Sequence, residues 1–193
     1  MQAGKLVILS GPSGVGKDTV LDAWIVSNPK VKRVVTYTTR PPRSTEVNGN
    51  DYHFVTLDQF QEFARNGHFL EFKEVHGNWY ASPLKDLDEM LSQGLIPVLK
   101  IDVQGALSAM KLRPDAVTIF ILPPSEHELE CRILGRGTET PEAIATRLEN
   151  ARKEIALSQH YQHKLVNACV EQTVTALEEI VNERLFDEAT GAS

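Results

Sequence analysis

The stretch Gly11-Pro-Ser-Gly-Val-Gly-Lys17 lies between an apolar run at residues 6–9 and a helical pattern from about residue 17 to residue 26. A continuous apolar run is typical of a central strand that is buried on both faces. Glycines let the following backbone curl so that successive N–H groups face inward. Together with the helix N-terminus and the Lys17 ammonium, these donors favour a bound polyanion. The sequence therefore predicts a strand, a phosphate-binding loop (P-loop) and a helix, in that order.

The residue that follows the P-loop departs from the usual pattern. That pattern continues with Ser or Thr, whose hydroxyl binds Mg²⁺, whereas this chain has Asp18 followed by Thr19. A carboxylate is also a hard oxygen ligand, so Asp18 is the candidate Mg²⁺ ligand, directly or through water, with Thr19 as a less well-placed substitute. In the alternative interpretation, Asp18 is simply an acid in the first helical turn, where the macrodipole favours it.

Apolar runs and helical patterns alternate along the chain. Runs at residues 34–35, 96–101 and 117–122 alternate with helical patterns at residues 106–110 and 126–134. This order predicts an α/β fold with a mostly parallel core sheet flanked by helices. At 193 residues, 41% of them hydrophobic, the chain has the size of a single domain spanning residues 1–193.

Two segments differ from this core, which we place at about residues 1–36, 81–134 and 158–186. Residues 37–80 contain Pro41-Pro42, Asn48-Gly49-Asn50 and short β-prone pieces at 53–55, 69–75 and 78–80, which predict a small mixed-β lobe. Residues 135–157 begin with glycines and become helical, which indicates a helical lid or, alternatively, an ordinary surface helix after a turn. A last helix is expected at about 171–184, with residues 187–193 as a frayed tail.

Charge and cysteine content limit the function classes. The net charge of −6 argues against broad binding to nucleic acid or to anionic membranes. A loose basic stretch at Lys30, Lys32, Arg33, Arg40 and Arg43 is either a solvated face or a local attractor for a small anion. Two cysteines without metal-ligand spacing, no secretory apolar region and no apolar run of about 20 residues predict a cytoplasmic protein without a transmembrane segment. The oligomeric state is left open.

Five motifs resemble those of guanylate kinases, in the same order. They are Thr36-Tyr-Thr-Thr-Arg40-Pro-Pro-Arg43 continuing to Asp51-Tyr52-His53-Phe54, Phe69-Leu-Glu71-Phe72, Gly77-Asn-Trp-Tyr80-Ala-Ser82, Ile101-Asp102-Val-Gln-Gly105 and Arg136-Gly-Thr-Glu-Thr140. The similarity extends from about Lys5 to Arg184, which is nearly the whole chain. It implies a P-loop nucleoside-monophosphate kinase fold in which the small lobe binds GMP.

The resemblance implies a set of GMP-binding residues whose chemistry is suitable. Guanidinium forks bind phosphate bidentately, and phenol hydroxyls donate neutral hydrogen bonds to it. Guanine presents N–H donors at N1 and N2, which carboxylates accept, whereas adenine has an acceptor at N1 that a carboxylate repels. The implied residues are Arg40, Arg43, Tyr52 and Tyr80 for the phosphate, and Thr36, Glu71, Ser82 and Asp102 for the base.

On the donor side, the resemblance implies that lid arginines close over the ATP phosphates. The implied ATP-binding residues are Gly11, Pro12, Ser13, Gly14, Val15, Gly16, Lys17, Asp18, Thr19 and Asn167, and the implied catalytic residues are Lys17, Arg40, Arg43, Arg132, Arg136 and Arg147. Asn167 is the weakest of these because Ala168-Cys169 replaces an acidic pair that often follows it.

Lys100 is a second departure, because the family usually has an acid two residues before the aspartate. Residues i and i+2 of a strand face the same side, so Lys100 is expected to point where Asp102 points. It would neutralise Asp102 or contact a phosphate.

The reaction that this resemblance implies is ATP + GMP ⇌ ADP + GDP with Mg²⁺. The GMP phosphate is largely dianionic at neutral pH, so its oxygen attacks without a dedicated general base. Catalysis then depends on in-line positioning and charge neutralisation. Because fold and P-loop alone do not fix the substrate, two alternatives stay open: a kinase resembling ribose bisphosphate kinase, and a non-catalytic guanylate-kinase-like binding domain. Tolerance of dGMP is also open.

The Asp18→Ser variant tests whether the acid is needed. It restores the hydroxyl of the usual pattern, so we expect steady-state kinetics to show Mg-ATP use that is preserved or improved. Loss of activity in a variant whose circular dichroism is unchanged would show that the carboxylate itself is required.

Overall fold

The computed structural model describes residues 4–75, 77–135 and 141–191, with side chains omitted at 141 and 187–191. The predicted strand before the P-loop is β1 (Val7–Ser10), which is the central strand of a five-stranded sheet. The sheet has the order β2-β7-β1-β8-β9, and each neighbouring pair is parallel. Its other members are β2 (Val31–Arg33), β7 (Ile96–Lys100), β8 (Val117–Leu122) and β9 (His163–Val166). The α/β prediction is confirmed.

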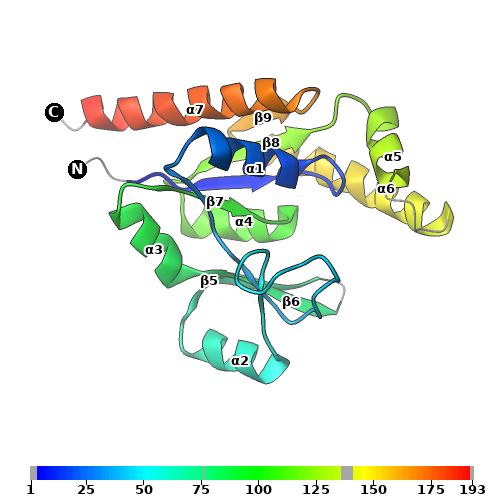
Figure 1. Cartoon of the computed structure of the whole chain (residues 1–193), viewed down its shortest axis with the longest axis horizontal. Helices are drawn as coiled ribbons and strands as arrows, with labels where there is room; N and C mark the ends of the chain where they lie inside the picture. Colours follow the sequence, from blue (N-terminus) through cyan, green and yellow to red (C-terminus); the bar gives the residue numbers. More distant parts are fainter. Residues whose placement is uncertain (1–3, 76, 136–140, 192–193) are drawn as a thin grey trace.

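Helices cover both faces of this sheet. Residues of β1 are therefore buried on each face. Val7 and Leu9 pack in one hydrophobic cluster, while Leu6 and Ile8 pack in another, as the two-residue period of a strand requires. Figure 1 shows α1 (Lys17–Ser27) and α7 (Val170–Gly191) on one side, and α3 (Leu84–Ser92) and α4 (Val103–Leu112) on the other. Three layers result.

The carboxyl ends of the parallel strands meet at one edge of the sheet and place the site there. The P-loop follows β1. Lys100 is the last residue of β7 and pairs in register with Leu9 of β1. Asp102 comes two residues later and begins α4. The phosphate-binding loop and the residues that end β7 are therefore neighbours, although they are far apart in the sequence.

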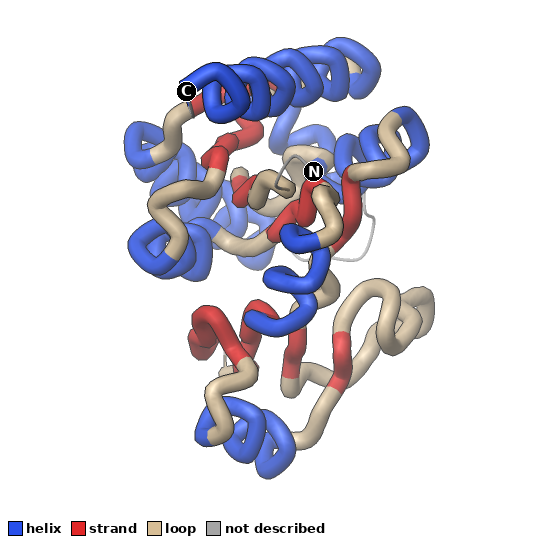
Figure 2. The backbone as a smooth tube through the Cα atoms, turned by 90° about the vertical axis from the view of Figure 1, so that its left-hand side faces the viewer, coloured by secondary structure: helices blue, strands red, loops and turns tan. Residues whose placement is uncertain are grey.

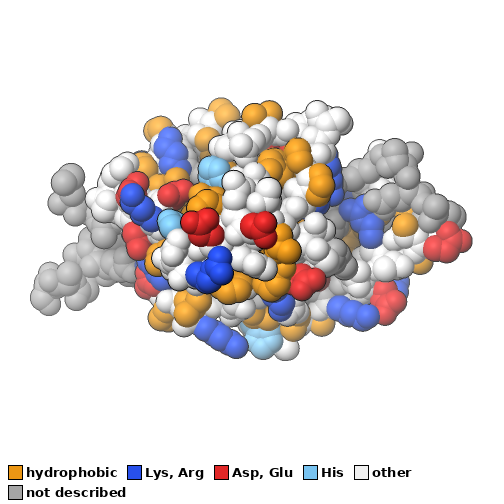
Figure 3. All heavy atoms as spheres, turned by 90° about the horizontal axis from the view of Figure 1, so that it is seen from below, with side chains coloured by type: hydrophobic (Ala, Val, Ile, Leu, Met, Phe, Trp, Pro, Cys, Tyr) orange, Lys and Arg blue, Asp and Glu red, His pale blue; other side chains and the backbone are white. Residues whose placement is uncertain are grey.

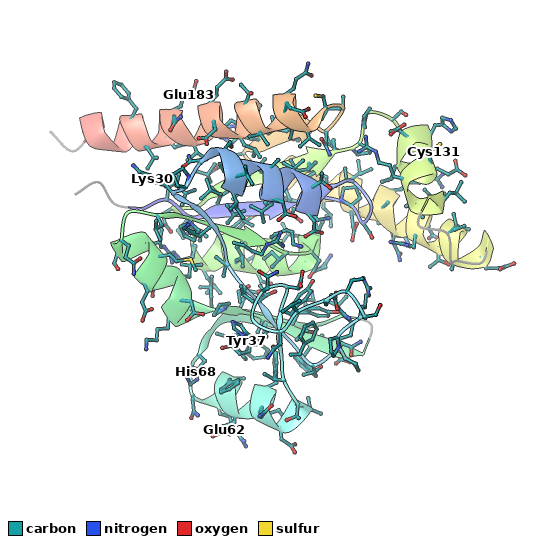
Figure 4. The ribbon with its side chains drawn as sticks, in the orientation of Figure 1. Lys30, Tyr37, Glu62, His68, Cys131 and Glu183 are labelled. Atoms are coloured by element: carbon teal, nitrogen blue, oxygen red, sulfur yellow. The ribbon has the colours of Figure 1, made fainter. Side chains whose placement is uncertain are left out.

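The small lobe below this edge has its own sheet, with the order β4-β3-β6-β5 (Figure 2). Its parallel and antiparallel pairs confirm the mixed-β prediction. A helix that the sequence analysis did not predict, α2, covers it through the buried Phe60. Figure 4 shows Tyr37 within the lobe and Glu62 on the outer side of α2. The elements are β3 (Tyr37–Thr38), β4 (His53–Phe54), α2 (Leu57–Arg65), β5 (Phe69–Val75) and β6 (Asn78–Pro83).

The predicted lid corresponds to α6 (Pro141–Ala156), which is followed by the 3₁₀ helix η1 (Leu157–His160). It packs on α5 (Glu126–Leu134), which lies at the bounds predicted from the sequence. Leu129, Ile133 and Ala151 form the buried contact between the two helices. Arg136, which was predicted as a catalytic residue, lies outside the described residues.

Two sequence-based boundaries were wrong. The second strand is Val31–Arg33 rather than residues 34–35, because Val34 is buried beyond the end of the strand, with its N–H bonded to the Val98 carbonyl. The last helix continues to Gly191, so the segment 187–191, predicted as a frayed tail, is helical.

Charges of both signs are interspersed on the face of the molecule in Figure 3, with hydrophobic side chains between them. Within the described ranges, none of the helices combines the length and the hydropathy that crossing a membrane requires.

Trp24 tests the packing of α1 on α7. Its side chain is fully buried, and its Nε1 donates to Glu178 Oε1 at 2.9 Å. Because Trp24→Ala leaves a cavity and removes this bond, we expect the free energy of unfolding to fall by about 3–5 kcal/mol in urea titrations. Val26→Ala on the same helix is the control, since Val26 is 87% exposed and its loss should change stability by less than about 0.5 kcal/mol. Equal effects would contradict this account of the core.

Candidate active site

The P-loop backbone adopts a conformation that requires glycine. Gly11, Gly14 and Gly16 have φ values of 150°, 89° and 96°. A Cβ atom added at Gly11 would lie 2.4 Å from the carbonyl oxygen of Ile121 in β8, which is backbone and cannot yield easily. The first glycine of the motif therefore allows both the turn and the close approach of β1 to β8.

Lys17 lies inside this turn. Its Nζ donates to the carbonyl oxygens of Gly11 at 2.6 Å and Pro12 at 3.0 Å. Desolvation lowers the pKa of Lys17 to about 8, while the carboxylate of Glu154 acts in the opposite direction. A phosphate at the loop would stabilise the charged ammonium and reverse this shift.

Two side chains hold the loop through the carbonyl of Val15, which accepts a hydrogen bond from each. One comes from Asn167 Nδ2 at 2.9 Å and the other from Arg132 at 3.2 Å. Asn167 is 4% exposed, and its Oδ1 accepts from the Thr173 hydroxyl at 3.2 Å. The structure thus places Asn167, predicted as an ATP-binding residue, against the backbone of the P-loop.

The described lid arginines also contact this loop. Arg132 on α5 forms an ion pair with Glu128 at 2.9 Å and reaches the Asn167 carbonyl at 3.2 Å. Arg147 on α6 donates to the Ser13 hydroxyl at 2.9 Å. Two of the three predicted lid arginines therefore contact the P-loop.

A cavity of about 280 Å³ extends from the P-loop to the small lobe. Residues predicted for the phosphate donor and residues predicted for GMP line it together. They are Gly11, Ser13, Lys17 and Asp18 on the donor side, and Thr36, Tyr52, Glu71, Tyr80, Ser82 and Asp102 on the acceptor side.

Glu71 and Ser82 face each other across neighbouring strands of the lobe. The Ser82 hydroxyl donates to Glu71 Oε1 at 2.5 Å, and both side chains are buried. Desolvation raises the pKa of Glu71 to about 7; the Ser82 bond opposes this shift, and the charge of Asp102 adds to it. The Oδ1 atom of Asp102 caps α4 through the backbone N–H groups of Gln104 and Gly105. Polar acceptors therefore border one end of the cavity.

Arg40 is held beside the predicted phosphate-binding tyrosines. Its guanidinium binds both carboxylate oxygens of Glu46, at 2.8 and 3.0 Å, and lies 5.6 Å from the ring centre of Tyr52. The Tyr52 and Tyr80 rings are 6.1 Å apart. Arg43 is exposed, and its backbone N–H donates to Glu46 at 2.7 Å. Among the described residues, the cavity lining includes Tyr52 and Tyr80 but neither arginine, and Arg40 lies beside the tyrosines.

Comparison with known proteins agrees with this geometry. The family model described as guanylate kinase matches residues 3–184. The chain belongs to the guanylate kinase family. It is 45% identical over 179 residues to guanylate kinase of Lactobacillus johnsonii, covering 92% of this chain and 88% of the relative. It is 43% identical over 181 residues to guanylate kinase of Trichodesmium erythraeum, covering 94% and 97%.

A solved structure supports the same family fold. The crystal structure of guanylate kinase from Anaplasma phagocytophilum matches with a TM-score of 0.77 and 32% identity, covering 96% of this chain and 88% of that one. The predicted family and the predicted fold are therefore both confirmed.

Several residues of this site were missed from the sequence, and two of them are acids. Glu154 on α6 lines the cavity, and its charge opposes the lowering of the Lys17 pKa. It comes seven residues, or about two helical turns, after Arg147, so the helical period alone could have placed both on one face. Glu46, which binds Arg40 through its side chain, has no comparable signal, because an acid in a loop has no periodicity.

The two positions that depart from the usual pattern contact each other. Asp18 Oδ1 accepts from Lys100 Nζ and, at 3.1 Å, from Arg33. Arg33 also binds Asp22 at 2.6 Å. Although desolvation acts in the opposite direction, the cations Lys100 and Arg33 lower the pKa of Asp18. The structure thus pairs Lys100 with Asp18, and the expected contact of Lys100 with a phosphate stays a prediction.

Glu71 makes stability depend on pH. Its folded pKa of about 7 lies above the ordinary value of 4.5, so between these values the native state holds a proton that the unfolded state has lost. Stability therefore falls as the pH rises through this window. Glu71→Gln removes the effect, and we expect it to stabilise the protein at pH 8 relative to pH 5 by on the order of 2 kcal/mol in urea unfolding.

The control is Glu62→Gln, since Glu62 is exposed on α2. A Glu71→Gln effect that is the same at both pH values would contradict the raised pKa.

Proposed function

We propose that this chain transfers the γ-phosphoryl group of ATP to GMP and so forms ADP and GDP. The observation that carries the proposal is the single cavity that joins the P-loop lysine to the Glu71, Ser82 and Asp102 side chains. Membership of the guanylate kinase family supports the same reaction.

At the acceptor end, Glu71 and Asp102 are proposed to accept the N–H donors of guanine, while Ser82 and Thr36 supply hydroxyls. The buried Glu71 carboxylate discriminates against adenine, whose N1 would leave it unpaired. Binding of guanine donors favours the charged form of Glu71, so GMP would draw its raised pKa downward. Arg40, Arg43, Tyr52 and Tyr80 are proposed to hold the GMP phosphate, with the arginines reaching it from beside the cavity.

At the donor end, the P-loop N–H groups and Lys17 are proposed to hold the ATP phosphates, and Arg132 and Arg147 to cover them from the lid. Arg136 belongs to the same proposal from the resemblance. A lid that excludes water would limit hydrolysis of ATP. The GMP phosphate oxygen then attacks in line, and positioning and charge neutralisation account for the rate.

The donor set next to Lys17 fits Mg²⁺. Asp18 carries a carboxylate and Thr19 a hydroxyl in the first turn of α1, and both side chains are exposed. Mg²⁺ is commonly held by one or two carboxylates together with substrate phosphates, so Asp18 would complete such a shell directly or through water. The ion would neutralise the charge that develops on the transferred group.

The two alternative functions are less well supported. A kinase of ribose bisphosphate has no use for a buried carboxylate that matches guanine, and a binding domain without catalysis has no use for Lys17 inside the loop. The site therefore favours the GMP kinase.

Coupled measurement of ADP production tests the proposal at fixed Mg-ATP with GMP, dGMP, AMP, UMP and ribose bisphosphate as acceptors. We expect GMP to be used with the highest kcat/KM. Lys17→Met should lower this value at least a hundredfold, because it removes the charge inside the P-loop. Preferred turnover of AMP would refute the guanine site, turnover of ribose bisphosphate alone would favour the related sugar kinase, and no transfer to any acceptor would favour the binding domain.

A further inference from the structure

The cavity contains an acid in an unfavourable place. Asp18 follows Lys17 directly and lines the donor side of the cavity, where a triphosphate would bind. Without a bound Mg²⁺, a carboxylate there repels the ligand, and the usual P-loop has a neutral hydroxyl at this position. Some other group has to offset this charge if the site is to bind ATP well.

Lys100 is placed to offset it. It ends β7, pairs with Asp18 across 82 positions of sequence, and also lines the cavity. The Lys100 side chain is only 17% exposed, while that of Asp18 is 62% exposed, so one member of the pair is shielded from solvent. The charge of Lys100 also contributes to lowering the pKa of Lys17, so it adds to the positive potential at the P-loop.

Arg33 extends the pair into a chain of alternating charge. It binds Asp18 at 3.1 Å and Asp22, one helical turn further along α1, at 2.6 Å. Asp18 is thus the member of α1 that both borders the cavity and contacts Lys100, whereas Asp22 contacts Arg33 outside that cavity. The two aspartates differ in position but not in charge, which gives a matched control.

We propose that Lys100 is a positioning residue of the donor site: it fixes the Asp18 carboxylate and cancels its charge, so that the P-loop accepts the phosphates of ATP. The proposal rests on the proposed function in one respect, that ATP is the ligand of the P-loop. It explains why two departures from the usual pattern occur in the same chain. A lysine at position 100 is required because an acid stands at position 18.

Binding of ATP in EDTA, measured by calorimetry, tests this charge balance without metal and without turnover. Lys100→Met leaves Asp18 uncancelled, so we expect the Kd for ATP to rise about tenfold. Asp18→Asn in the Lys100→Met background restores the balance and should bring the Kd within about threefold of the unmodified protein. Asp22→Asn in that background, with the same change of charge, should recover much less.

The rescue separates charge cancellation from a merely structural ion pair. The double variant Asp18→Asn/Lys100→Met lacks the ion pair as fully as either single variant, so a structural role predicts no recovery. A Kd that Lys100→Met leaves unchanged, or a rescue by Asp22→Asn equal to that by Asp18→Asn, would overturn the proposal. Thermal unfolding of each variant confirms that binding is measured on folded protein.

Failure of the proposed function would look different. Absence of GMP phosphorylation by the unmodified chain, with the expected pattern of ATP affinities, would refute the GMP kinase and leave the Asp18–Lys100 pair standing. Normal GMP phosphorylation with ATP affinities insensitive to Lys100 would refute the pair alone.

Discussion

The carbonyl oxygen of Ile121 lies so close to Gly11 that no side chain fits between them, and the rest of the site is arranged around this contact. It brings the end of β1 against β8 and starts the turn that encloses the Lys17 ammonium. Because the other parallel strands end at the same edge, the residues after β7 are brought to the same place. The small lobe lies below this edge, and the cavity extends from the P-loop to it.

The features that follow from local pattern were predicted well from the sequence. The apolar run of β8 and the helical pattern of α5 were placed at their observed bounds, because β8 is a buried apolar run and α5 lies between the capping residues Ser125 and Gly135. In contrast, α2 was missed, although Thr56 and Gln59 form a capping box at its start. Its nine residues lie in a segment dominated by turn and strand signals, and packing of Phe60 on the small sheet stabilises it as a helix.

In the site too, features that follow from sequence motifs were predicted, and features that depend on the folded chain were not. Motif order was sufficient to group Thr36, Glu71 and Ser82, which line one cavity. Long-range side-chain pairing was not predictable, because no periodicity links positions such as 18 and 100, which are 82 residues apart. The contact that Asn167 makes could not be predicted for a similar reason. An amide carries no sign of its partner, and only the folded chain shows that this one bonds to the Val15 carbonyl.

The Val15 carbonyl of the P-loop is bonded to side chains that come much later in the sequence. Its two side-chain partners, Arg132 and Asn167, lie 117 and 152 positions further along the sequence. During synthesis, the glycine turn would therefore leave the ribosome long before the groups that brace it. The nascent chain would carry the phosphate-binding motif without these hydrogen bonds until β9 had paired with β8. Nucleotide capture would then be one of the last properties that this protein acquires as it is made.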